Sequence, residues 1–108
     1  MKDWRDTHWT RDSETVWITE LINFLGDDIT DIQVSDLPRR LPTEKDRVDE
    51  ANLDYPIIVL KIDGQYQCVL DGNHRLQQAV NKKKDNIKAR VLSLDSDKIP
   101  KVFKRIFG

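Results

Sequence analysis

The strongest constraint on the fold is a pair of β-rich runs in the middle of the chain, joined by a two-residue turn signal. Residues 56–62 are rich in isoleucine and valine, which is typical of a buried strand. Asp63 and Gly64 follow, and an Asp-Gly pair between two such runs indicates a tight hairpin. Residues 65–70 then supply the return strand. We therefore predict an antiparallel hairpin at the centre of the molecule.

The N-terminal side of this hairpin is expected to contain an arm, a helix, a strand and a further short helix. Residues 1–12 are polar and predict an irregular arm, whereas residues 13–25 carry apolar side chains at helical spacing. Asp12 or Ser13 can cap this helix, and Gly26 can end it. Ile32 and Val34 alternate with polar residues, which predicts a short strand over 31–37. Thr43 resembles an N-cap, so a short helix is predicted from there to about residue 53.

The C-terminal side is expected to contain a helix, a strand and a final helix. The first helix follows the break at 71–73 and ends at the lysine run 82–84, whose charge suits a helix C-terminus. Residues 87–94 predict a strand. Asp95 or Ser96 can open the last helix, with Pro100 tolerated in its first turn.

Together these elements predict one α+β domain over residues 1–108, in which helices flank a small mixed sheet and residues 1–26 form an N-terminal arm and helix. A length of 108 residues suits a single modest core, and the formal net charge is −1. The single cysteine, Cys68, excludes an internal disulfide, so a reducing cytoplasmic setting fits. The apolar runs are too short to span a bilayer, so no membrane partner is expected.

The most informative functional motif is the turn at residues 71–75, with the sequence Asp-Gly-Asn-His-Arg, between a strand and a helix. A helix N-terminus presents unpaired backbone N–H groups to anions, and Gly72 allows close approach. Arg75 offers a planar cationic fork suited to phosphate, and His74 can donate a hydrogen bond. The alternative is purely structural: Asp71 or Asn73 caps the helix, and the two basic residues are solvated.

The sequence resembles the ParB/sulfiredoxin-like superfamily over residues 32–94. Three stretches carry the resemblance: the opening strand and basic loop at 34–41, a proline-hydrophobic strand start at 55–59, and the turn with its helix at 70–79. Of these, the last is the most specific. Asn73 stands where sulfiredoxins have their cysteine, and Cys68 lies earlier, on the preceding strand, so sulfiredoxin chemistry is not expected.

The resemblance implies a nucleotide-binding module that uses ATP or another NTP. In this reading Asp71, Gly72, Asn73, His74 and Arg75 hold the phosphates, and Arg39 and Arg40 reach them from the basic loop. Phosphotransfer to a small-molecule acceptor is a further implied activity. His74 would stabilise the transferring phosphoryl group, and Glu44 is the carboxylate chosen as general base. Asp71 is the candidate ligand for Mg²⁺, with the nucleotide supplying the other contacts.

Two alternatives remain open on sequence alone. The first is a DNA-binding or ParB-like nuclease module, in which the C-terminal lysines and Arg105 contact the phosphate backbone. The second is a non-catalytic protein-interaction module, of the kind that phages and mobile elements encode. Neither the nucleotide base nor the oligomeric state is predicted.

Overall fold

The computed structural model of the protein describes residues 4–38 and 54–108. Its centre is a four-stranded mixed sheet with the strand order β3-β6-β4-β5. The strands are β3 (Thr30–Gln33), β4 (Ile57–Ile62), β5 (Gln65–Asp71) and β6 (Asn86–Ser93). β6 runs antiparallel to β3 and parallel to β4, and β4 pairs antiparallel with β5. The predicted α+β class and small mixed sheet are confirmed.

The central hairpin forms as predicted. Asp63 and Gly64 both have positive φ, 52° and 75°, as a two-residue turn of the hairpin type requires. The Asp95 carboxylate accepts hydrogen bonds from both turn amides, at 3.0 Å from Asp63 N and 3.3 Å from Gly64 N. This acidic side chain was expected to open the last helix. It instead clamps the turn, and α4 (Lys101–Phe107) begins later, directly after Pro100.

The N-terminal segment differs from its prediction. Residues 8–17 form a hairpin of β1 (His8–Arg11) and β2 (Glu14–Trp17), and only then does α1 (Ile18–Leu25) begin. A short 3-10 helix, η1 (Trp4–Asp6), precedes the hairpin. Asp12 and Ser13, expected as helix caps, have positive φ and make the turn of this hairpin. The predicted end of the helix at Gly26 is confirmed, with φ of 64° and its N–H bonded to Ile22 O.

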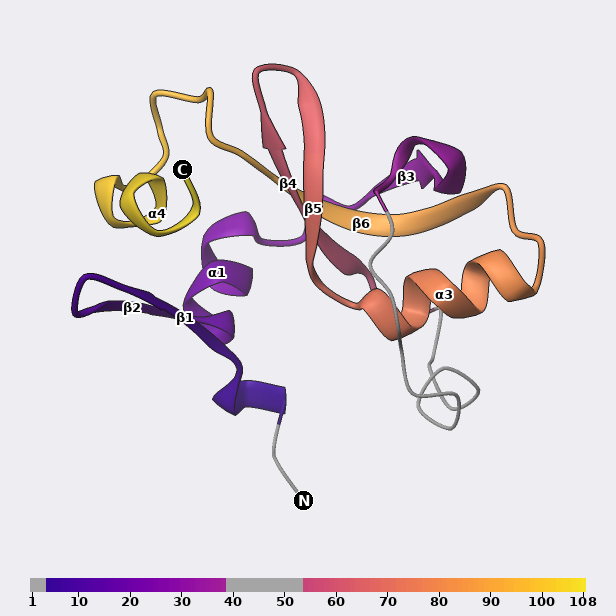
Figure 1. Cartoon of the computed structure of the whole chain (residues 1–108), viewed down its shortest axis with the longest axis horizontal. Coiled ribbons are helices and arrows are strands. Elements are labelled where there is room, and N and C mark those ends of the chain that lie inside the picture. The colour runs from indigo at the N-terminus through magenta and orange to yellow at the C-terminus, as the bar shows by residue number, and fades with distance from the viewer. Residues whose placement is uncertain (1–3, 39–53) are drawn as a thin grey trace.

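The two faces of the sheet are covered by different elements (Figure 1). One face packs against α3 (Asn73–Asn81) and the 3-10 helix η2 (Val34–Asp36); the other packs against α1, α4 and the β1–β2 hairpin. Each face buries its own apolar cluster. Ile57 and Val59 belong to the first cluster and Ile58 and Leu60 to the second, because successive strand residues point to opposite faces. β4 is therefore the central strand of the core.

Ring contacts join the two ends of the chain on the second face. Trp9 meets Phe107 edge-to-face at 5.4 Å between centroids, and Phe24 meets Phe103 at 5.3 Å. The Arg11 guanidinium donates hydrogen bonds to the carbonyl oxygens of Arg105 and Gly108. These contacts hold the N-terminal hairpin against α4. Among the described residues, no helix is long and apolar enough to cross a membrane.

Candidate functional site

The predicted turn between β5 and α3 is present, but its helix is not capped as expected. Gly72 is the N-cap residue, with φ 102° and ψ 24°, and no side chain makes a capping hydrogen bond. The predicted capping roles of Asp71 and Asn73 are therefore both wrong. The Asn73 amide nitrogen instead reaches back to Val69 O, at 3.5 Å.

Glycine is required at position 72 by its conformation and by the neighbouring strand. A positive φ of 102° disfavours any residue with a Cβ. A Cβ added there would also lie 2.5 Å from Ile57 Cγ2, which is far inside van der Waals contact. The turn therefore packs directly against the start of β4, which brings α3 close to the segment that precedes that strand.

Arg75 uses this proximity to join three parts of the chain. Its Nη1 donates to Pro56 O at 2.7 Å, and its Nη2 donates to the Asp71 carboxylate at 2.8 Å. The two side chains of the ion pair are 19% and 30% exposed. An arginine held at two points presents a fixed guanidinium plane, which is the arrangement that suits a carboxylate or phosphate group.

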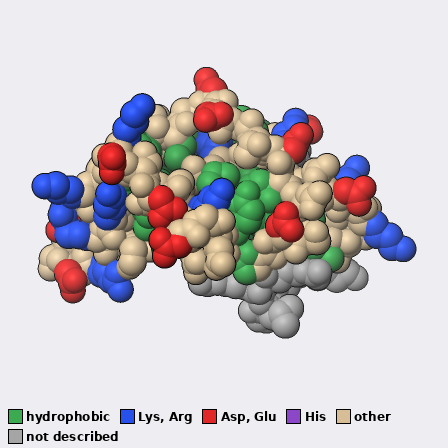
Figure 2. Space-filling model, turned by 90° about the horizontal axis from the view of Figure 1, so that it is seen from above, with side chains coloured by type: hydrophobic (Ala, Val, Ile, Leu, Met, Phe, Trp, Pro, Cys, Tyr) green, Lys and Arg blue, Asp and Glu red, His purple; other side chains and the backbone are tan. Residues whose placement is uncertain are grey.

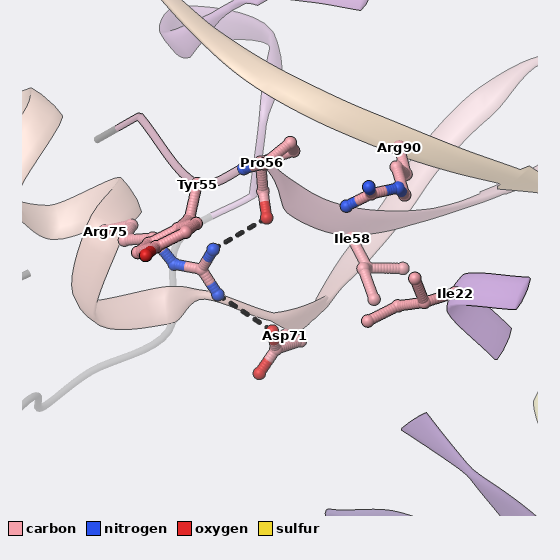
Figure 3. A pocket seen from close by; sticks show the side chains of 7 residues that line it. All are labelled: Ile22, Tyr55, Pro56, Ile58, Asp71, Arg75 and Arg90. Carbon is pink, nitrogen blue, oxygen red and sulfur yellow. Dashed lines mark hydrogen bonds and ion pairs between the residues drawn. The ribbon is translucent and has the colours of Figure 1, made fainter. Parts of the chain in front are cut away.

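A cavity of about 600 Å³ lies beside this pair. The described residues that line it come from α1, the segment before β4, β4 itself, the end of β5, α3 and β6: Ile22, Tyr55, Pro56, Ile58, Asp71, Arg75 and Arg90. Figure 3 shows the guanidinium groups of Arg75 and Arg90 on either side of the cavity, with Ile58 and Ile22 nearby. The volume falls within the range of small-molecule sites.

Arg90 is the functional candidate that the sequence reasoning missed. It lies on β6 and is partly buried, and its Nε donates to Gly26 O at 2.8 Å, at the end of α1. Within the described residues this is the only hydrogen bond of its side chain, so both terminal nitrogens are open to a ligand. The available signal was its place among apolar residues on the predicted strand 87–94, because a charged side chain that such a strand partly buries needs a partner.

The remaining lining residues give the cavity an apolar floor and an aromatic rim. Ile58 is 1% exposed and belongs to the core, whereas Tyr55 is 65% exposed. Figure 3 shows this ring beside the Arg75 guanidinium, and an exposed ring at a cavity rim is suited to stacking a flat ligand. Tyr55 was predicted only as part of the resemblance to a family strand, without a role of its own.

The other predicted site residues that the structure describes, Gly72, Asn73 and His74, do not line this cavity. Arg39, Arg40 and Glu44 lie outside the described residues, as does the helix predicted from Thr43. Of the predicted residues that the structure describes, Asp71 and Arg75 line the cavity.

The Asp71 carboxylate, predicted as a Mg²⁺ ligand, already accepts a hydrogen bond from Arg75. Residues 4–38 and 54–108 contain no group of three or more His, Cys, Asp or Glu side chains placed to hold a metal ion. These residues alone do not fit a metal site, and we derive no metal-dependent step from them.

The basic residues of the C-terminal region are mixed with acidic ones. The Nε of Arg105 on α4 donates to both carboxylate oxygens of Glu14 in the N-terminal hairpin, at 2.9 and 3.0 Å. Figure 2 shows basic side chains at both ends of the molecule, with acidic side chains between and beside them. DNA binding through this region stays a prediction without a geometric feature that favours it.

A scan against models of known protein families and a search of curated proteins both found no match for this chain. The resemblance to the ParB/sulfiredoxin-like superfamily therefore stays a prediction, and the geometry of the cavity carries the functional argument.

Proposed function

We propose that this chain binds a small phosphate-bearing ligand of the nucleotide class, ATP or another NTP, in the cavity beside Arg75 and Arg90. The observation that carries the proposal is the placement of two partly buried guanidinium groups on the walls of one cavity. Phosphate oxygens are the acceptors that arginine forks suit best.

The charges of the lining residues support an anion. Arg75 and Arg90 carry two positive charges, and Asp71 carries one negative charge that pairs with Arg75. Arg75 is held by two protein acceptors, whereas Arg90 is held at Nε alone. Arg90 is therefore the principal phosphate contact in this proposal, and Arg75 adds its charge and the donors that Asp71 and Pro56 leave open.

The apolar lining supports a ligand that also has a flat, uncharged part. Ile22 and Pro56 offer an apolar surface for a sugar or base, and the Tyr55 ring offers a stacking partner at the rim. Inorganic phosphate alone would leave this surface unused. A nucleoside phosphate would contact both the arginines, through its phosphate, and the apolar lining, through its sugar or base.

The proposal concerns binding. Phosphotransfer to a small-molecule acceptor requires a general base, and the residue chosen for that role, Glu44, lies outside the described residues. His74 does not line the cavity. Any catalytic step therefore stays a prediction from the resemblance.

The test is isothermal titration of the purified chain with ATP, CTP, GTP and UTP, each with and without Mg²⁺. We expect saturable binding of at least one nucleotide, weakened by about 10- to 100-fold in Arg90→Met, the range for losing hydrogen bonds to a charged group. Lys88→Met is the matched control, because it removes one positive charge from an exposed position on the same strand. It should leave affinity within about twofold, since exposed charges act weakly at physiological salt.

Absence of binding by all four nucleotides would overturn the proposal. So would equal affinity of the Arg90→Met variant and the parent, provided that both melt at the same temperature.

A further inference from the structure

The carboxylate of Asp71 is the one acidic group among the described residues that line the cavity. Its Oδ2 accepts the hydrogen bond from Arg75 Nη2 at 2.8 Å. Its Oδ1 accepts no hydrogen bond within residues 4–38 and 54–108, and the side chain is 30% exposed. Figure 3 shows the first oxygen facing the Arg75 guanidinium and the second turned away from it. Asp71 therefore keeps an acceptor for a ligand after its bond to Arg75 is made.

The partner of this oxygen must be a hydrogen-bond donor, which excludes the phosphate of the ligand. An ionised carboxylate accepts hydrogen bonds and donates none, and it repels a phosphate oxygen. The donors of a nucleotide are its ribose hydroxyls and the exocyclic amines of some bases. The phosphate therefore belongs at Arg90, whose terminal nitrogens have no partner among the described residues. A part of the ligand that carries a donor belongs at Asp71.

The order of the side chains around the cavity favours the sugar over the base as that part. In Figure 3 Asp71 lies between the Tyr55 ring and the Arg90 guanidinium, and all three residues line one cavity. A nucleotide has the same order, because its ribose joins the base to the phosphate. A base stacked on Tyr55 and a phosphate bound to Arg90 leave the ribose beside Asp71.

We propose that Asp71 accepts a hydrogen bond from a ribose hydroxyl and so makes the cavity selective for ribonucleotides over deoxyribonucleotides. This inference rests on the proposed binding of a nucleotide. A carboxylate that binds a ribose hydroxyl is a general means of sugar recognition, used in dinucleotide-binding folds. A site that hydrogen-bonds a hydroxyl discriminates against the analogue that lacks it, because its polar group is then left without a partner.

The test is isothermal titration of the full chain with ATP, CTP, GTP and UTP, each beside its 2′-deoxy and 3′-deoxy forms. For a nucleotide that binds, we expect removal of one of the two hydroxyls to weaken binding by about tenfold or more, as for loss of a hydrogen bond to a charged group. In Asp71→Ala the ribose and deoxy forms should bind within about twofold of each other. Asp71→Asn keeps a neutral acceptor, so its ratio should lie between those of the parent and Asp71→Ala.

Arg90→Lys is the matched control, since it keeps the charge beside the phosphate and loses the fork of donors. It should weaken binding of ribonucleotides and deoxyribonucleotides alike and leave their ratio unchanged. Equal affinity of the parent for a nucleotide and for both of its deoxy forms overturns this inference and leaves nucleotide binding standing. A parent ratio that Asp71→Ala preserves does the same. Absence of binding by every nucleotide overturns the proposed function and this inference together.

Discussion

At the scale of single residues, Gly72 offers the sharpest test, because two separate costs oppose any side chain there. The first is positive φ, and the second is overlap with Ile57 Cγ2 at 2.5 Å. We expect Gly72→Ala to lower the free energy of unfolding by about 2–4 kcal/mol, the sum of backbone strain and overpacking. Urea denaturation followed by circular dichroism measures this loss.

Gly64 is the matched control for this variant. Its φ is 75°, but a Cβ added there meets nothing within 4 Å. Gly64→Ala should therefore lower the free energy of unfolding through backbone strain alone, by about 1–2 kcal/mol. Equal losses in the two variants would show that contact with Ile57 does not constrain the turn.

The candidate site was predictable only where its residues are close in sequence. Asp71 and Arg75 are four residues apart and were both predicted, because they belong to one local motif, the Asp-Gly-Asn-His-Arg turn between a strand and a helix. Arg90 reaches the same cavity from β6, which depends on the parallel pairing of β6 with β4. That pairing joins residues about 30 positions apart, and no local pattern indicates it.

At the scale of elements, the β4–β5 turn depends on a side chain that lies far along the chain. Asp95 follows β6, and its carboxylate accepts from two consecutive amides of the turn. We expect Asp95→Ala to lower the free energy of unfolding by about 1 kcal/mol, a value near the low end for charge-assisted bonds because the group is exposed.

Thermal denaturation of Asp95→Ala beside Asp97→Ala checks this expectation. Asp97 is an exposed carboxylate two residues away, and it makes no hydrogen bond within the described residues. The prediction fails if the two variants melt together. In that case removal of a negative charge, rather than loss of the turn bonds, would account for any change.

The N-terminal hairpin shows why element type was harder to predict than element position. Residues 13–25 have helical apolar spacing, yet their first part forms β2 because β1 lies beside it. Asp and Ser are common both in helix caps and in tight turns, so Asp12 and Ser13 fit either reading. Val16 is fully buried in β2, where a β-branched side chain is favoured. The central hairpin, in contrast, was predicted correctly because its Asp-Gly signal permits one arrangement.

At the scale of the whole molecule, the two apolar clusters share one sheet, and β4 contributes to both. This arrangement predicts a single cooperative unfolding transition, since loss of either cluster exposes β4. The second cluster also joins the chain ends, through Trp9 with Phe107 and Phe24 with Phe103. Damage to α4 should therefore destabilise residues on both sides of the sheet.

Phe103→Ala tests this coupling. Phe103 is 4% exposed and contacts both Phe24 and Phe107. We therefore expect the substitution to lower the free energy of unfolding by about 3–5 kcal/mol, the range for a buried phenylalanine. All three tryptophans lie within residues 4–17, so their fluorescence reports on the N-terminal segment, whereas far-ultraviolet circular dichroism reports on the whole chain. The two signals should give one midpoint in urea for the parent and for the variant. If fluorescence changes at lower urea than circular dichroism, the N-terminal hairpin and α4 form a separate unit, and the shared strand does not couple the two faces.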